Sequence, residues 1–366
     1  MNNKFYKLLA VAMMICLSHA AHTETFTVTN LNDAGPGSLR QAMLDASVTQ
    51  ENDVINVMVS GVINLVTAEA PEFNVFPIFS GVTINGDADG DNEPIVLLMT
   101  EDISGRFFQM TDAIINDVVF DGGRAFLSGG AIFATGTNEL NRCLLINGQA
   151  GFIAGLENGI GGGIRVNEGT TTMTDCTMRN NTAGRGAAVS INRNGTLTLV
   201  NCTMADNIVY PNNFGQESTI WLDGTLNMTN CIIADTSPDG TTDIFDLGNT
   251  ININVNNLVE NFVCAIPANC GDETFASMED PMLLPTSDDP YFVFMLSPDS
   301  PIANSGIGAT VMPGGVAIPN IAVQADMETI PTLGEWGIIL LGLLMMIVSL
   351  VAVKSSQRIA NEIDRI

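Results

Sequence analysis

The stretch LNRCLLINGQA (residues 140–150) is followed by three variants of itself: MTDCTMRNNTA (173–183), LVNCTMADNIV (199–209) and MTNCIIADTSP (228–238). A cysteine holds the same place in each, and successive cysteines are 33, 26 and 29 residues apart: Cys143, Cys176, Cys202 and Cys231. The frame continues upstream in INDVVFDGGRA (115–125), with Val118 at the cysteine position. It continues downstream in INVNNLVENFV (253–263), with Asn256 at the cysteine position. Self-similarity at such a period indicates a repeat architecture.

Each repeat also carries a second short apolar run that ends in a Gly/Thr turn: GGAIFATGT (129–137), GGGIRVNEGT (161–170), GAAVSINRNGT (186–196), STIWLDGT (218–225) and DIFDLGNT (243–250). The runs alternate polar and apolar residues with period two, which is typical of β-strands. One repeat cannot bury its apolar positions alone, so the repeats must stack. We predict an all-β fold, a right-handed parallel β-helix (solenoid) with one coil per repeat.

The stacking assigns roles to columns of residues. The cysteine column alternates with Val118 and should point inward as a set of small apolar side chains. Buried free thiols are favoured, and disulfides between vertical neighbours are the alternative. Four residues after each cysteine a turn is expected to be stabilised by a short polar side chain: Asn147, Asn180, Asp206 and Asp235. Separately, CAIPANC should close a loop through a Cys264–Cys270 disulfide, as in other exported proteins.

Both termini carry targeting features. Residues 1–21 read as a signal peptide, with Lys4 and Lys7 before an apolar run and small residues near Ala20. An uncleaved anchor helix is the alternative. An open β-helix end needs a cover, and GPGSLRQAMLDA predicts a capping helix, with Ser38 as N-cap and Gln41 three residues on. Its apolar face would consist of Leu39, Ala42, Met43 and Ala46.

The charge balance excludes one class of partner. Acidic residues outnumber basic ones 40 to 13, which gives a formal net charge of -27. Such a surface repels phosphate backbones, so no nucleic acid is expected as a partner. With 46% hydrophobic and 14% charged residues, the chain should be folded rather than disordered.

FTVTNLNDAGPGSLRQAM (residues 26–43) and DPYFVFMLSPDSPIANSG (289–306) resemble the opening and closing segments of secreted bacterial β-helix proteins with pectin-lyase-like architecture. The resemblance implies a β-helix domain over residues 22–310 and an exported protein. It implies little about activity, because this architecture carries lyases, hydrolases, adhesins and passive surface proteins alike.

The C-terminal IPTLGEWG resembles the signature of IPTL-CTERM sorting domains at every defined position: Ile330, Pro331, Thr332, Leu333, Trp336 and Gly337. After a linker (311–329), the motif and a membrane helix would occupy residues 330–358, the helix itself residues 337–353, and a cytoplasmic tail residues 359–366. The resemblance implies an exosortase-type partner, a precursor anchored in the inner membrane, and delivery to the cell surface or extracellular matrix of a Gram-negative bacterium. A plain anchor without sorting is the alternative.

Residues that could carry catalysis are sparse, and we assign none. The histidines, His19 and His22, fall at the signal junction. Arg165, Arg179 and Arg193 are candidate lyase bases, but they stand in different columns without an evident carboxylate cluster. The alternative to a binding or structural role is a polysaccharide lyase or hydrolase on the same scaffold. No cofactor is expected. Calcium is an open alternative at GDADGDNE, which has aspartates at 87, 89 and 91 but lacks the glycine and glutamate of a calcium loop.

One outward column could hold a ligand. The second strands place Phe133, Arg165, Ser190, Trp221 and Phe245 at equivalent positions, and aromatic side chains on a flat face can stack on sugars or on a partner surface. We therefore predict a candidate glycan or cell-surface ligand face at Phe133, Arg165, Trp221 and Phe245. The alternative is that a long turn or the C-terminal segment covers this column.

Overall fold

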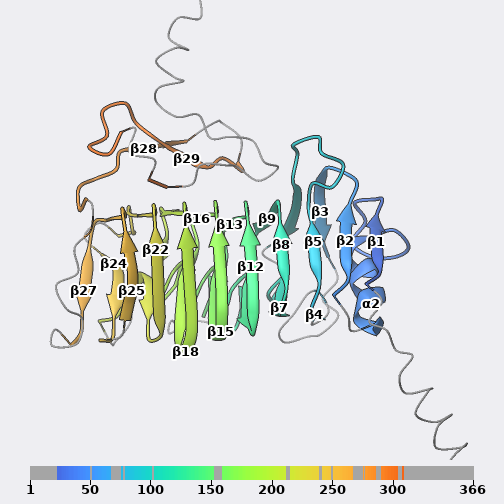
Figure 1. The fold of residues 1–366 in the computed structure, drawn as a ribbon, viewed down its shortest axis with the longest axis horizontal. Coiled ribbons are helices and arrows are strands. Elements are labelled where there is room, and N and C mark those ends of the chain that lie inside the picture. Colours follow the sequence, from blue (N-terminus) through green and yellow to red (C-terminus); the bar gives the residue numbers. More distant parts are fainter. Residues whose placement is uncertain are drawn as a thin grey trace, which may run out of the picture. The chain divides into compact units, whose positions relative to one another are not determined.

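The computed structural model describes residues 23–308 except 50–51, 67–75, 77–78, 101–102, 152–158, 212–214, 239–240, 249, 267–274, 276, 286–289 and 304–306. These residues form parallel β-strands, one α-helix and a short antiparallel pair (Figure 1). The predicted signal peptide, linker, sorting motif and membrane helix all lie outside the described residues.

The parallel strands of the described chain form three sheets. The first consists of β1 (Thr25–Val28), β2 (Val54–Val57), β4 (Phe79–Ser80), β5 (Thr83–Asn85), β7 (Phe108–Thr111), β8 (Ile114–Asn116), β11 (Ile132–Thr135), β12 (Thr137–Asn141), β15 (Ile164–Thr174), β18 (Val189–Val200), β21 (Ser218–Leu222), β22 (Thr225–Thr229), β24 (Thr242–Asp246), β25 (Thr250–Val255) and β27 (Phe262–Cys264). The second consists of β3 (Gly61–Leu65), β6 (Ile95–Met99), β9 (Val118–Asp121), β13 (Leu144–Ile146), β16 (Thr177–Arg179), β19 (Thr203–Ala205), β23 (Ile232–Ile233) and β26 (Leu258–Val259). The third consists of β10 (Arg124–Ala125), β14 (Gln149–Ala150), β17 (Thr182–Ala183) and β20 (Ile208–Val209).

Each strand pairs in parallel with the equivalent strands of the neighbouring repeats. Thr177 of β16 pairs with Thr203 of β19, which in turn pairs with Ile232 of β23. The chain therefore visits the three sheets in turn and then starts again one layer along. This arrangement is consistent with a β-helix-like solenoid, in which backbone hydrogen bonds between layers satisfy the strand edges.

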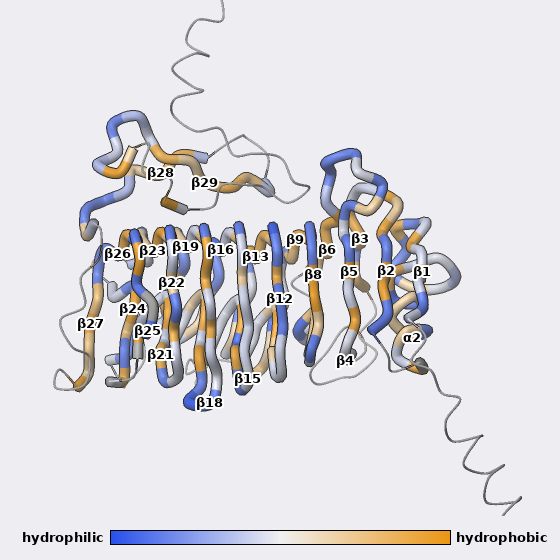
Figure 2. The backbone as a smooth tube through the Cα atoms, in the orientation of Figure 1, coloured by the Kyte–Doolittle hydropathy of each residue, from blue (hydrophilic) through white to orange (hydrophobic). Residues whose placement is uncertain are grey.

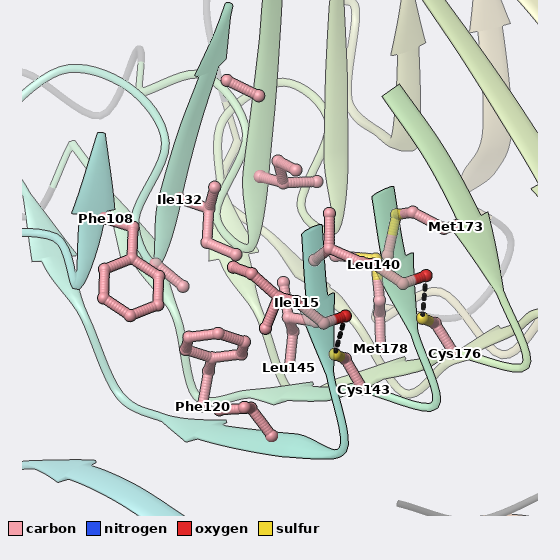
Figure 3. Packing of buried hydrophobic residues seen from close by; sticks show 14 of the residues in the cluster. Phe108, Ile115, Phe120, Ile132, Leu140, Cys143, Leu145, Met173, Cys176 and Met178 are labelled. Carbon is pink, nitrogen blue, oxygen red and sulfur yellow. Dashed lines mark hydrogen bonds between the residues drawn. The ribbon is translucent and has the colours of Figure 1, made fainter. Parts of the chain in front are cut away.

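The interior is filled by the inward residues of every repeat, so hydrophobic and hydrophilic residues alternate along the strands (Figure 2). Cys143, Cys176, Cys202 and Cys231 are free and fully buried in this core, which confirms the predicted inward column of free thiols. Figure 3 shows Cys143 Sγ donating to the Ile115 carbonyl at 3.6 Å, and Cys176 Sγ donating to the Leu140 carbonyl at 3.4 Å. Burial raises the pKa of the Cys176 and Cys231 thiols, so they stay protonated.

One predicted register was wrong by a residue. Asn257, and not Asn256, continues the cysteine column, because Ile232 pairs with Leu258. Asn257 is fully buried and its Oδ1 accepts from the Cys231 backbone N–H at 2.8 Å. The cause is a register shift between Leu226 and Asn227 in the β22–β25 ladder, which adds one residue to the last repeat.

The predicted polar turn residues adopt the left-handed conformation, with φ of 58° at Asn147, 54° at Asn180, 55° at Asp206 and 52° at Asp235. Asparagine and aspartate tolerate this region better than other residues with a Cβ atom. The next position holds a buried pair that the pattern did not predict. Asn181 Nδ2 donates to Asn207 Oδ1 at 3.1 Å and to the Leu145 carbonyl at 2.9 Å, and both asparagines are fully buried.

The N-terminal layer carries α2 (Leu39–Thr49), as predicted. Ser38 Oγ accepts the Gln41 backbone N–H at 3.2 Å, which confirms the N-cap. The Gln41 side chain does not return the bond but reaches Asp45 at 2.8 Å. The predicted apolar face is buried in the core: Leu39, Ala42, Met43 and Ala46.

A C-terminal antiparallel pair, β28 (Leu283–Pro285) and β29 (Phe294–Leu296), folds back on the second sheet. Val293 is buried in a cluster with the outward residues Val119 of β9 and Leu144 of β13. Arg179 of β16 fixes the segment: its Nε donates to the Phe292 carbonyl at 3.2 Å, and its Nη2 donates to the Pro290 carbonyl.

Candidate functional site

The predicted outward column exists in the first sheet. Phe133 pairs with Arg165, Arg165 with Ser190, Ser190 with Trp221, and Trp221 with Phe245, so the side chains follow one another on successive layers. The order follows from the sequence, because each residue stands between two inward positions of its strand, as Arg165 does between Ile164 and Val166, both fully buried. We call these five residues the outward column.

The column is not an exposed aromatic strip. Trp221 is 7% exposed, Phe245 is 9% exposed and Ser190 is fully buried. Part of the cover comes from two further arginines. The Arg106 guanidinium lies 5.0 Å from the Phe133 ring centroid, and the Arg185 guanidinium lies 5.1 Å from that of Trp221. Cations at such distances from a ring are attracted by its π-electrons.

Arg106 and Arg185 were not identified from the sequence. Each stands in the connection before a strand of the first sheet, Arg106 two residues before β7 and Arg185 four residues before β18. A shared feature is the preceding glycine, Gly105 and Gly184. These connections vary in length between repeats, so sequence alignment did not bring the two arginines together with the outward column.

Three polar atoms in the column are buried and have no hydrogen-bond partner among the described residues: Arg165 Nη1, Ser190 Oγ and Trp221 Nε1. They come from three successive layers. Buried polar groups in folded proteins are nearly always satisfied, so each unsatisfied group needs an explanation. A bound ligand is one such explanation, and it would have to offer acceptors to the arginine and the indole, which can only donate.

Charge also distinguishes this region. Burial and, second, the positive charge of Arg185 lower the pKa of Arg165, while Asp223 opposes the shift. Burial lowers the pKa of Arg106 to about 10. Both groups remain cationic at neutral pH. Within the described part of the chain neither forms an ion pair, whereas three other arginines do: Arg40 with Asp33, Arg142 with Asp117 and Arg193 with Asp223.

The other two arginines considered as lyase bases lie elsewhere. Arg179 donates a hydrogen bond to the segment before β29, and its guanidinium lies 3.9 Å from the Phe292 ring centroid. Arg193 is 81% exposed at the side chain and lies 3.8 Å from Asp223. The structure therefore brings neither of them into the outward column.

Among the described residues, two clusters of three carboxylates have oxygens close enough to share a cation. One consists of Asp87, Asp89 and Asp91, and the other of Asp235, Glu260 and Asp280. The first is the predicted calcium candidate. Burial and, second, a hydrogen bond that protonated Asp87 donates to Asp89 raise the pKa of Asp87. Neither group includes a residue of the outward column, and calcium binding at the first stays a prediction.

The remaining predicted site residues are only partly described. Cys264 is disulfide-bonded, and Cys270, its predicted partner, lies outside the described residues, so this pairing stays a prediction. In the described part of the chain, no helix has the length and apolar character needed to cross a membrane. The predicted membrane helix at residues 337–353 falls outside that part.

Comparison with known families bears on the C-terminal tail. Residues 329–350 match the IPTL-CTERM motif. This match spans the predicted motif residues Ile330 to Gly337 and confirms that prediction at the level of sequence. The motif implies export and C-terminal sorting by an exosortase-type system, and hence a secreted protein sorted to the cell surface. Neither the curated proteins nor the solved structures include a match to the chain.

Proposed function

We propose that the chain is an exported right-handed parallel β-helix with a binding or structural role at the cell surface or in the extracellular matrix. Before sorting, its C-terminal helix holds the precursor in the inner membrane. The ligand is held at the outward column. The observation that carries the binding role is the set of unsatisfied buried atoms at Arg165, Ser190 and Trp221.

The arrangement of carboxylates favours binding over catalysis. A polysaccharide lyase of the kind considered above needs a basic residue beside a group of carboxylates that holds a metal-bound acidic sugar. Neither of the two carboxylate clusters found among the described residues includes a residue of the outward column, and Arg179 and Arg193 are engaged elsewhere. The enzyme alternative predicts product formation and is tested together with binding.

Sorting is tested by substitutions in the tail. We expect Trp336→Ala to leave the uncleaved precursor in the membrane fraction of a Gram-negative host that carries the sorting enzyme. Glu335→Gln is the matched control, because it lies at an undefined position of the motif and should be processed normally. Immunoblotting of cell fractions measures the processing. Equal processing of the two variants would contradict the proposed route.

Binding is tested on a glycan array and on whole cells, with analysis of products after incubation. We expect the wild-type chain to bind at least one class of glycan or the cell surface, without releasing shortened products. Arg165→Gln should lose this binding, while Arg193→Gln, which removes a paired and exposed arginine, should keep it. Binding that is equal in both variants would place the ligand elsewhere. Shortened products that depend on Arg165 would favour the enzyme.

A further inference from the structure

The unsatisfied atoms of the outward column restrict what its ligand can be. Arg165 Nη1 and Trp221 Nε1 are donors and cannot accept a hydrogen bond, and Ser190 Oγ can do either. All three are buried. The group that satisfies them must therefore supply acceptor oxygens, at least two of them, to side chains that are stacked on successive layers.

Charge narrows the choice further. Arg165 has no ion-pair partner in the described residues, and the charges of Arg185 and Asp223 act on its pKa in opposite directions. Arg106 is 6% exposed and also has no ion pair within the described part of the chain, and its Nη2 donates to the Ser128 carbonyl at 2.9 Å. The chain has a formal net charge of -27, so a group of arginines without ion pairs among the described residues is unusual in it. Buried positive charge is stable only when an anion or strong dipoles compensate it.

A stacked neutral sugar fits this surface less well. The Arg185 guanidinium covers the Trp221 ring at 5.1 Å, and Phe245 is 9% exposed, so little aromatic surface is open for stacking. Hydrogen bonds from arginine to an anionic oxygen are shorter and about twice as strong as bonds between neutral groups.

We infer that the outward column binds an oxyanion, either a carboxylate or a sulfate or phosphate ester, on Arg165 Nη1, Ser190 Oγ and Trp221 Nε1. The inference rests on the proposed binding function and names the chemistry of its ligand. The anion satisfies the three buried atoms and compensates the charge of Arg165. The acidic remainder of the chain repels long polyanions, so the site takes an isolated anionic group rather than a densely charged polymer.

The test is calorimetric titration of the full-length chain in detergent micelles with sodium sulfate, sodium phosphate and sodium acetate, at ionic strength held constant with sodium chloride. We expect saturable binding of at least one anion. Arg165→Gln should weaken it about tenfold or more. Trp221→Phe keeps a ring but removes the Nε1 donor, and Ser190→Ala removes the hydroxyl, so each should weaken binding several-fold.

The matched control is Arg193→Gln. This substitution also removes one arginine charge, from an exposed position of β18, and the variant should bind the anion as the wild type does. Thermal unfolding followed by circular dichroism shows whether each variant is folded. Absence of saturable anion binding by the wild type, or an equal loss in Arg193→Gln, would overturn the inference. Glucose, glucuronate, glucose 6-sulfate and glucose 6-phosphate then identify the source of the oxyanion.

The two proposals can fail separately. If the array finds an Arg165-dependent ligand and only neutral sugars bind, the binding function stands and the oxyanion inference is wrong. If sulfate binds saturably through Arg165 but neither glycan nor cell surface binds, the inference stands and the proposed surface ligand is wrong.

Discussion

The Arg179 guanidinium lies 3.9 Å from the centroid of the Phe292 ring, although 113 residues separate the two along the chain. The same side chain donates from Nε to the Phe292 carbonyl at 3.2 Å. One arginine on β16 therefore fixes the C-terminal segment to the outer face of the second sheet.

We expect Arg179→Ala to lower the free energy of unfolding by about 1–3 kcal/mol, because it removes a cation–π contact and leaves two carbonyls without donors. The segment around β28 and β29 should also become sensitive to protease before the sheets unfold. Thermal unfolding and limited proteolysis measure the two effects. Arg193→Ala is the control, and equal behaviour of the two variants would show that Arg179 does not hold the segment.

The buried asparagine pair should be costly to disturb. Asn181 accepts the Gly148 N–H at 2.9 Å and donates to the Leu145 carbonyl and to Asn207. Asn181→Ala removes these side-chain bonds, and Asn207 Oδ1 keeps only the bond from the backbone N–H of residue 181. We expect the free energy of unfolding, measured by chemical denaturation, to fall by about 2–4 kcal/mol.

Asn141→Thr is the matched control for that substitution. Asn141 lies on the outside of β12, where its Nδ2 donates to Asn116 at 3.0 Å, and the next layer already has Thr174 in that position. Its effect should stay within about 0.5 kcal/mol. A similar loss of unfolding free energy in both variants would mean that burial of the asparagine pair does not add to stability.

The four core cysteines should resist alkylation in the folded protein. Their side chains are fully buried, and burial raises the pKa of Cys176 and Cys231, which removes the reactive thiolate. Mass spectrometry after maleimide treatment should find these thiols unlabelled in buffer and labelled together above the denaturation midpoint. Rapid labelling of any one of them in buffer would contradict its inward position.

Stability should depend on pH through Asp243. This carboxyl is fully buried, accepts from Thr236 and from the Asn261 backbone N–H, and has its pKa raised by burial to about 7. The unfolded carboxyl has the ordinary value of 3.8. The folded state therefore keeps a proton that the unfolded state releases, and the contribution of Asp243 falls as the pH rises from about 4 to about 7.

Asp243→Asn should remove this part of the pH dependence and stabilise the protein at pH 8 relative to wild type. Asp299→Asn, at an exposed position, should leave the slope unchanged. Melting temperatures measured from pH 4 to pH 8 compare the three proteins. An unchanged slope in Asp243→Asn would mean that this carboxyl is ionised in the folded state.

Local rules explain which parts of the structure were predictable. The alternation of residues in each short run, the inward cysteines and the turn residues such as Asn180 depend only on strand geometry and on which residues tolerate positive φ. The Ser38 cap is equally local, since it needs only a hydroxyl three residues before a free N–H. The Asn256 error arose because a register shift changes the length of one repeat without changing its residue types.

The candidate site was predictable only in part. Phe133, Arg165, Trp221 and Phe245 form one column because their strands share a period, and that period is visible in the sequence. Cover of this column was an open alternative in the sequence, but the part that Arg106 and Arg185 play in it was not predicted, because they reach the column from connections of irregular length.

The sequence by itself determined the stacked repeats, the capping helix and the sorting tail, since each of these depends on residues close together in the chain. Only the tertiary structure decided that three donors of the outward column lie buried without partners among the described residues, and that Arg179 contacts residues more than a hundred positions away. Burial and pairing depend on what the folded chain places around a side chain, and no local pattern carries that information.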